Sequence, residues 1–276
     1  MTAAQHNQHP IIFLKLGGSL ITDKSRPHTH RPQVLQRLAA EIKSVLDEQP
    51  DYRLIIGHGS GSFGHVPAKR YGTRQGVHTE EQWRGFAEVW FEASSLTRIV
   101  IESLAQAGLP VIALSPSASA ISQDGRVHSW ELKPIIAALQ KGLLPIVHGD
   151  VVFDNQRGGT ILSTEDLFEH LAHVLVPERI LLAGIEPGVW ADYPACTKLI
   201  EEITTNSLPH IFPILGGSAQ VDVTGGMASK VQQSMALVER HPGLVIQIFS
   251  GERPGNVQNA LKGELLGTIL HAPTEG

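Results

Sequence analysis

Residues 11–24 read IIFLKLGGSLITDK, a short apolar run that ends in a pair of glycines flanked by two lysines. An apolar run of this length bounded by glycine is typical of a strand buried on both faces, so we predict a strand over 11–16 and a tight turn after it. Lys15 ends this strand and Lys24 lies beyond the turn. Such a lysine could simply lay its stem along apolar surface, or it could present its ammonium group to a cleft beyond the strand.

The rest of the chain repeats this alternation of short apolar runs and longer amphipathic segments. Further strands are predicted within 52–57, 110–114, 143–149, 179–184 and 244–249, and helices within 34–46, 80–107, 164–175 and 227–239. Short buried strands that alternate with helices are the pattern of βα units around a mainly parallel sheet. The sequence therefore predicts an α/β fold with a mainly parallel central sheet.

Composition excludes several classes of function. The chain has 276 residues, 42% of them hydrophobic, which is enough for a substantial core. A net charge of −5 provides no basic field for nucleic acid, and no apolar run approaches the roughly 18 residues of a membrane span. The single cysteine, Cys196, cannot form an internal disulfide or a cysteine zinc cluster. We expect a cytoplasmic protein with neither a nucleic-acid nor a membrane partner.

The histidines do not predict a metal site. There are 14 of them, but the one close pair, His170 and His173, lacks the H-E-x-x-H spacing of a zinc helix. We therefore expect no metal held by the protein alone.

Glycine-rich loops follow several of the predicted strands. They read LGGS at 16–19, GHGSGSFGH at 57–65, HGD at 148–150, LSTED at 162–166 and TGGM at 224–227. In open α/β sheets, ligands bind beyond the carboxyl ends of the strands, where such loops lead into helices. Each loop alone suits an ordinary tight turn as well as a phosphate site, but the five together predict a polar, phosphate-binding cleft.

The loop GHGSGSFGHV at 57–66 partly matches three nucleotide-binding motifs. Its glycines at 59, 61 and 64 spell G-x-G-x-x-G, and Val66 extends them to the protein-kinase form. The Walker A motif would need Lys-Ser or Lys-Thr where the chain has His65-Val66. A dinucleotide fingerprint belongs in the first βα turn, which here is LGGS, and no H-R-D or D-F-G motif follows. The loop therefore serves another purpose.

A third lysine points to a polyphosphate. Lys230 stands near the start of the helix that TGGM opens, where a cation opposes the helix dipole unless an anion shares the site. Together with Lys15 and Lys24 it would gather positive charge around the glycine loops.

Four motifs together resemble the amino acid kinase superfamily and, within it, the isopentenyl phosphate kinases: KLGGSLITDK, GSGSFGH, HGD and DVTGGMASK. The nearest competing branch that has the histidine of GSFGH is that of the fosfomycin kinases. The resemblance implies an open αβα sandwich with two lobes in one domain over 11–271, after a disordered tail at 1–10. The acceptor-binding lobe would span about 11–175 and the ATP-binding lobe about 176–271. It also implies a homodimer that uses ATP with Mg²⁺.

The resemblance also assigns residues by position. Catalytic residues would be Lys15, Lys24, His65, Asp166 and Lys230. ATP would contact Lys15, Gly17, Gly18, Ser19, Gly61, Gly225, Gly226 and Lys230. The acceptor would contact Gly59, Ser60, Gly61, His65, Gly149, Asp150 and Thr164. Asp150 or Asp166 would orient the lysines, and we favour Asp166. Relatives often read S-G-D-D where this chain has residues 163–166, STED.

The implied reaction needs no general base, because a phosphate monoester is already mostly anionic at neutral pH. The two alternatives are a phosphonate kinase of the fosfomycin type and a non-catalytic sensor of a nucleotide or phosphometabolite. An alkyl tail would need an apolar wall near His65. The stripe Phe86, Val89, Trp90 and Ala93 has the spacing of one helix face, which also suits ordinary core packing.

Overall fold

The computed structural model describes residues 10–215 and 226–273, so residues 1–9 of the tail predicted at 1–10 lie outside the described residues. The strands are β1 (Ile11–Leu16), β2 (Arg53–His58), β3 (Val111–Ala113), β4 (Ala120–Gln123), β5 (Arg126–Trp130), β6 (Leu144–His148), β7 (Asp150–Asp154), β8 (Gly158–Leu162), β9 (Arg179–Gly184), β10 (Val189–Trp190), β11 (Leu199–Ile200), β12 (Glu202–Thr204), β13 (Val245–Ser250) and β14 (Thr268–His271). The helices are α1 (Gly18–Ile21), α2 (Pro32–Glu48), α3 (His65–Tyr71), α4 (Glu80–Gln106), α5 (Lys133–Gln140), α6 (Thr164–Leu175), α7 (Leu208–Ile211), α8 (Gly226–Arg240) and α9 (Asn256–Leu261), with short 3-10 turns at Pro116–Ala118 and Phe212–Ile214.

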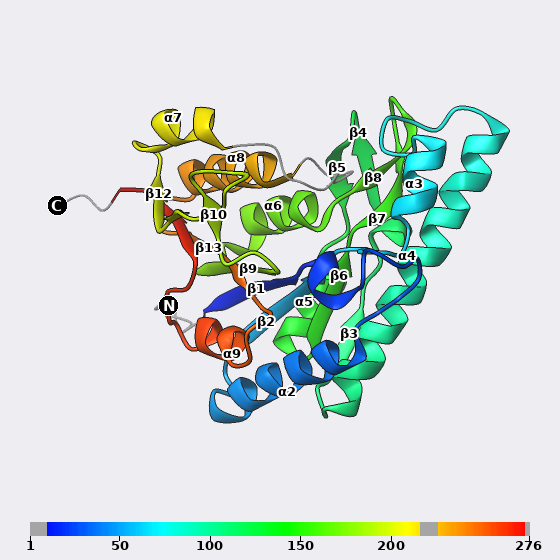
Figure 1. Cartoon of the computed structure of the whole chain (residues 1–276). Helices are drawn as coiled ribbons and strands as arrows, with labels where there is room; N and C mark the ends of the chain where they lie inside the picture. The colour runs from blue at the N-terminus through cyan, green and yellow to red at the C-terminus, as the bar shows by residue number, and fades with distance from the viewer. Residues whose placement is uncertain (1–9, 216–225, 274–276) are drawn as a thin grey trace, which may run out of the picture.

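An eight-stranded sheet forms the centre of the molecule (Figure 1). Its strand order is β12-β14-β13-β9-β1-β2-β6-β3, and among its pairs β13 and β14 run antiparallel while the others are parallel. β1 lies between β2 and β9, with Leu16 opposite His58 on one side and Ala183 on the other. This register brings the loops that follow these three strands together at one edge of the sheet.

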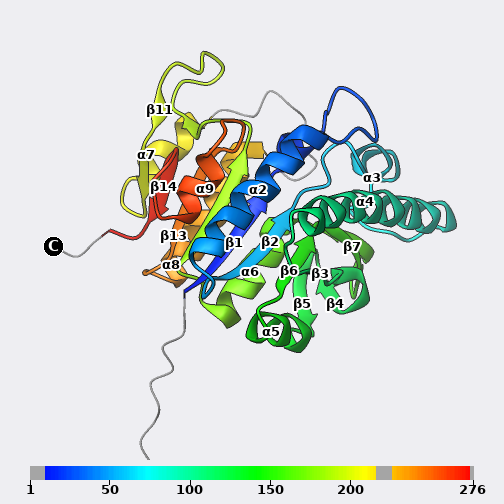
Figure 2. The same ribbon diagram turned by 90° about the horizontal axis from the view of Figure 1, so that it is seen from below.

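Alternation along β1 distributes the core to both faces of this sheet. Ile11 and Phe13 pack into a cluster with α5, α6 and α8, whereas Ile12, Leu14 and Leu16 pack into a second cluster with α2, α4 and α9. Helices cover both faces in Figures 1 and 2. Because both faces are buried, the strands read as continuous apolar runs. The predicted α/β sandwich with a mainly parallel sheet is confirmed.

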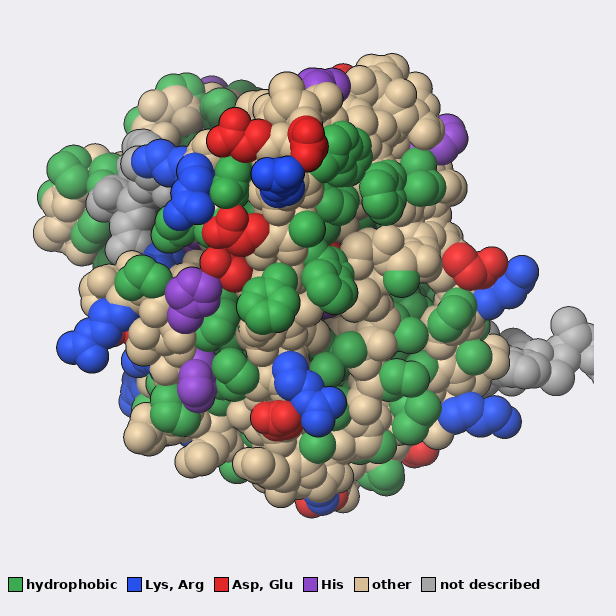
Figure 3. All heavy atoms as spheres, turned by 90° about the vertical axis from the view of Figure 1, so that its right-hand side faces the viewer, with side chains coloured by type: hydrophobic (Ala, Val, Ile, Leu, Met, Phe, Trp, Pro, Cys, Tyr) green, Lys and Arg blue, Asp and Glu red, His purple; other side chains and the backbone are tan. Residues whose placement is uncertain are grey.

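A second, four-stranded sheet of order β5-β4-β7-β8 lies beside α3 and α4 (Figure 1). α4 begins at a capping box in which Thr79 and Gln82 satisfy each other's backbone N–H groups. Phe86, Val89 and Ala93 on this helix are buried, but Trp90 is 44% exposed, so the predicted four-residue face is wrong for Trp90. Figure 3 shows this side of the molecule, where hydrophobic and charged side chains are interspersed.

Within residues 10–215 and 226–273, no helix has both the length and the apolar character required to cross a membrane.

Candidate functional site

A cavity of about 310 Å³ opens where the loops after β1, β2 and β9 converge. Of the predicted site residues, it is lined by Lys15, Gly17, Gly18, Ser19, Lys24, Gly59, Ser60, Gly61, His65, Gly149, Asp150, Thr164, Gly226 and Lys230. Asp166 does not line the cavity, and Gly225 lies outside the described residues. The structure therefore gathers at one place residues that lie more than 200 positions apart in the chain.

The glycines of the first two loops allow their backbones to touch. A Cβ atom at Gly18 would lie 2.4 Å from the nitrogen of Gly61, and one at Gly59 would lie 2.9 Å from the nitrogen of Gly18. Gly61 also has a φ of +54°, in the left-handed region that favours glycine. Side chains at these positions would push the two loops apart, so the glycines bring the loop backbones close together at the cavity wall.

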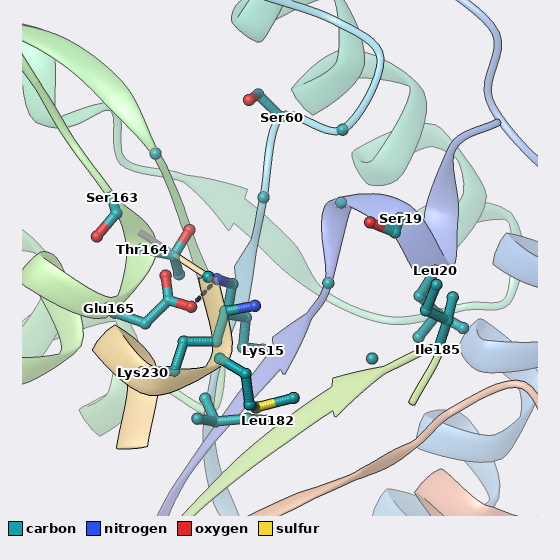
Figure 4. Close-up of a pocket in the computed structure, with 18 of the residues that line it drawn as sticks. Lys15, Ser19, Leu20, Ser60, Ser163, Thr164, Glu165, Leu182, Ile185 and Lys230 are labelled. Carbon is teal, nitrogen blue, oxygen red and sulfur yellow. Dashed lines mark ion pairs between the residues drawn. The ribbon is translucent and has the colours of Figure 1, made fainter. Parts of the chain in front are cut away.

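Two lysines lie at the polar centre of the cavity together with the carboxylate of Glu165. Lys15 at the end of β1 forms an ion pair with Glu165 in the first turn of α6, and their side chains are only 12% and 11% exposed. Lys230 from α8 points toward the same place (Figure 4). Burial by itself raises the pKa of Glu165, but the charges of Lys15 and Lys230 outweigh it and hold that pKa below its ordinary value. Glu165 is therefore a carboxylate that holds cations in place.

Among the described residues, Glu165 and not Asp166 is seen paired with Lys15, although we favoured Asp166 for the role of orienting the lysines. Asp166 accepts a hydrogen bond of 2.7 Å from the backbone N–H of Ser163 and one of 3.1 Å from Gln233, and its Oδ2 lies 3.4 Å from Arg74. Consecutive helical residues point about 100° apart, so the two carboxylates cannot share a direction.

A pattern in the sequence could have found this difference. Residues 163–166, STED, match the S-x-x-D form of a capping box, in which the fourth residue turns back to cap its own helix. The structure shows this box, because Ser163 and Asp166 exchange side-chain-to-backbone hydrogen bonds. The pattern thus assigns Asp166 to the helix and leaves Glu165 for the cavity.

An apolar part of the cavity lining adjoins His65. His65 is the first residue of α3, and Ala68, Val89, Ala93 and Ile161 line the wall near it. Of the predicted stripe on α4, Val89 and Ala93 therefore face the cavity, whereas Phe86 packs edge-on against Trp83 at 5.2 Å between ring centroids. The lining therefore brings an imidazole ring together with short apolar side chains.

A buried polar cluster lies behind Gly149. Asp150 lines the cavity, accepts hydrogen bonds from the backbone N–H groups of Ser117 and Val151, and has its pKa raised to about 6 by burial. His148 lies 3.6 Å from this carboxylate and stacks on His58 at 5.3 Å. Burial lowers the pKa of His148 to about 4 and that of His58 to about 3, so both rings are neutral at pH 7.

The hydroxyl of Thr164 donates to the backbone carbonyl of His58 at 2.6 Å. Its proton is therefore committed within the protein, so a hydrogen bond from Thr164 to an anionic substrate would have to come from the backbone N–H.

Another part of the cavity lining is aromatic and aliphatic. Trp190, Tyr193, Leu215 and Met227 are among the residues that line it. Sequence reasoning did not assign any of them individually, because they come from a loop-rich segment and a helix start without a repeating pattern. A flat aromatic lining suits a planar ring such as a nucleotide base.

The described residues contain no group of three histidine, cysteine, aspartate or glutamate side chains arranged to hold a metal ion. His173 instead contacts His241 on the surface, with 2.8 Å between ring nitrogens.

Comparisons with known proteins agree with this geometry. Residues 10–250 match the amino acid kinase family. The isopentenyl phosphate kinase of Methanocaldococcus jannaschii is 33% identical over 94% of this chain and 98% of its own length. That of Arabidopsis thaliana is 30% identical over 84% of this chain and 78% of its own length. A solved isopentenyl phosphate kinase structure superimposes with a TM-score of 0.80 at 30% identity, covering 94% of this chain and 99% of that one. The predicted resemblance is thus confirmed, and the chain belongs to the amino acid kinase family.

Proposed function

We propose that this protein is an ATP-dependent isopentenyl phosphate kinase that produces isopentenyl diphosphate and ADP. The observation that carries the proposal is the combination of features in one cavity. Lys15, Lys230 and Glu165 form a charged centre, and the same cavity is lined by His65 with short apolar side chains and by aromatic side chains. Relatives at 30% and 33% identity over most of the chain are named isopentenyl phosphate kinases, which supports the same acceptor here.

The nucleotide would lie with its base at Trp190 and Tyr193 and its phosphates at the charged centre. Backbone N–H groups around Gly17 and Gly18 would meet the phosphate oxygens, as glycine loops commonly do. The lining suits a polyanion that brings its own cation, since the carboxylate at the centre is already paired with lysine. Mg²⁺ would therefore enter as part of the ATP substrate and neutralise phosphate charge.

The transfer itself needs alignment and charge neutralisation. An oxygen of the acceptor phosphate forms a bond to the γ-phosphorus as the bond to the bridging oxygen of ADP breaks, so no proton has to be removed. Lys15 and Lys230 would offset the charge of the phosphates, and Lys24 would stabilise the group in transfer. Glu165 would hold Lys15 in direction, and His65 would donate a hydrogen bond to the acceptor phosphate.

The apolar wall favours a prenyl monophosphate over the competing acceptors. Ala68, Val89, Ala93 and Ile161 offer hydrocarbon surface beside His65, which a short alkyl tail would cover favourably. Fosfomycin is smaller and more polar and would leave much of that apolar wall exposed to water. A sensor would have no need of the charged centre in which Glu165 holds Lys15.

Further features of the proposal follow the resemblance. Residues 11–175 would form the acceptor lobe and residues 176–271 the ATP lobe, with β1 and β9 pairing across the boundary. The enzyme would act as a homodimer in the cytoplasm. Sedimentation of the purified protein at several concentrations would test the dimer.

ADP release tests the reaction. Purified protein with Mg²⁺-ATP would be offered isopentenyl phosphate, dimethylallyl phosphate and fosfomycin in parallel, with products identified by mass. We expect preferential turnover of the prenyl monophosphates. Preferential turnover of fosfomycin would establish the phosphonate kinase instead, and nucleotide binding without turnover of any acceptor would favour the sensor.

The His65→Asn variant tests the acceptor end. We expect the KM for isopentenyl phosphate to rise about 10- to 100-fold, since a hydrogen bond to a charged group is lost, while the KM for ATP stays within about twofold. An unchanged acceptor KM would remove His65 from the site.

A further inference from the structure

Glu92 is a buried carboxylate outside the cavity lining. It lies in the middle of α4, on the side that packs toward the glycine loop, and its side chain is only 9% exposed. Carboxylates are almost never buried unless they are paired, because removal of the charge from water costs several kcal/mol. The contacts of its two oxygens therefore indicate what the charge does.

The two oxygens of Glu92 hold two different segments. Oε2 accepts a hydrogen bond from the backbone N–H of Gly64, and Oε1 lies 3.3 Å from Nε2 of His28. Gly64 belongs to the glycine loop at 57–65, whereas His28 belongs to the loop that connects Lys24 to α2. One side chain of α4 thus joins two loops that are 36 residues apart in sequence.

The contact with Gly64 acts on the start of α3. Gly64 is the N-cap of this helix, with φ of +79° and no capping side chain of its own, and His65 follows as the first helical residue. Because a peptide unit is rigid, fixing the N–H of Gly64 fixes the plane of the Phe63–Gly64 peptide, which directly precedes the backbone of His65. Glu92 thereby helps to hold the backbone from which the imidazole ring extends.

The contact with His28 adds to a set of hydrogen bonds that connect the loop of His28 to the glycine loop at 57–65. The backbone N–H of His28 donates to the carbonyl of Ser62 at 3.3 Å, and the N–H of Thr29 donates to the hydroxyl of Ser62 at 3.2 Å. The His28 ring also packs edge-on against Phe63, with 5.6 Å between centroids. The loop that carries Lys24 is therefore held against the loop that leads to His65.

From these contacts we propose that Glu92 is a positioning residue of the kinase, which keeps His65 and the loop of Lys24 in register for the acceptor phosphate. The inference rests on the proposed function for its kinetic consequence, but the contacts themselves are independent of it. His28 is 55% exposed, so its pairing is screened by water and the contact with Gly64 is the stronger of the two.

Three variants separate the two contacts. Glu92→Ala removes both, Glu92→Gln keeps an acceptor for Gly64 without the charge, and His28→Asn removes the contact with Glu92. Asn is suited to position 28, since it tolerates the left-handed backbone there, with φ of 52°. Glu102→Gln, at an exposed ion pair with Arg98 on the same helix, is the matched control.

We expect the KM for isopentenyl phosphate to rise about 10- to 100-fold in Glu92→Ala and less in the other two variants, with the KM for ATP within about twofold. Amide hydrogen exchange in residues 22–31 and 59–65 should accelerate in the same order. The Glu102→Gln control should match the parent in both measurements.

Equal increases in both KM values, or a loss of melting temperature with unchanged kinetics, would reduce Glu92 to a structural residue and overturn the proposal. If the parent protein turns over no acceptor, the proposed function fails instead. Amide hydrogen exchange alone then tests whether Glu92 holds the two loops in place. Unchanged exchange in both loops of Glu92→Ala and Glu92→Gln would then refute the positioning role.

Discussion

Replacement of Glu165 by glutamine removes the charge that faces Lys15 while keeping the shape of the side chain. Breaking a buried ion pair by removal of one partner costs about 3–5 kcal/mol. The side chain of Lys15 lies against a cavity and is 12% exposed, so we take the lower end of this range, about 3 kcal/mol. Unfolding entropy near about 2 cal/mol/K per residue makes this a fall of roughly 5 °C in Tm for a chain of 276 residues.

The same change should affect ligand binding and turnover in opposite directions. Without Glu165, the two lysines have lost a competing anion, so pyrophosphate should raise the Tm of Glu165→Gln by more than it raises that of the parent. The lysines have also lost their orientation, and misplacement of about 1 Å costs on the order of 100-fold in rate. We therefore expect kcat to fall about 10- to 100-fold.

Thermal melting with and without pyrophosphate, together with ADP release, would measure these effects. Asp166→Asn is the matched control, because asparagine keeps an oxygen that can accept from the N–H of Ser163. It should leave kcat within about threefold of the parent. The reasoning is refuted if Glu165→Gln keeps both its Tm and its kcat, and a larger loss of kcat in Asp166→Asn would return the orienting role to that residue.

Two further predictions concern acid stability and the glycine loops. The folded state keeps His58 and His148 neutral down to pH values of about 3 and 4, whereas the unfolded chain protonates both below pH 6.5, so they destabilise the fold as pH falls from 6.5 to 4. Asp150, with its pKa raised to about 6, acts in the opposite direction, which leaves a net of about one proton and a loss of about 1 kcal/mol per pH unit. Urea unfolding at pH 4.5, 5.5 and 6.5 checks this, and a constant or rising stability on acidification contradicts it. Gly18→Ala would place a Cβ atom 2.4 Å from the nitrogen of Gly61. We therefore expect the free energy of unfolding to fall by about 1–3 kcal/mol and the KM for ATP to rise. A normal Tm together with a normal KM would show that the two loops can separate freely.

The βα framework could be predicted from the sequence because it depends on local pattern. A strand buried on both faces reads as an apolar run, as residues 11–16 do, and β1 occupies the same residues. A long amphipathic segment reads as a helix, and α4 extends from Glu80 to Gln106 within the predicted 80–107. The location of the glycine loops could also be predicted, because the carboxyl ends of parallel strands lie at the same edge of a sheet.

Trp90 shows where periodicity stops being informative. Its spacing from Phe86 is that of a shared helix face, yet Trp90 is 44% exposed while Phe86 is 9% exposed. A residue at the border of a helix face is buried only if neighbouring elements extend far enough to cover it. The spacing of residues along the helix gives no information about that extent.

The lysines, His65 and the described glycines that resemblance and pattern singled out all line one cavity. Lys15 lies near a strand end, and His65 and Lys230 lie at or near helix starts, which local pattern can indicate. The structure decided which groups meet within the cavity. Glu165 faces Lys15 while its neighbour Asp166 caps α6, and Glu92 reaches two loops from a helix that the motifs do not mention. Local pattern specifies the direction of a side chain relative to its own helix or strand, but the partner at the end of that direction is set by how distant elements pack, and only the tertiary structure contains that packing.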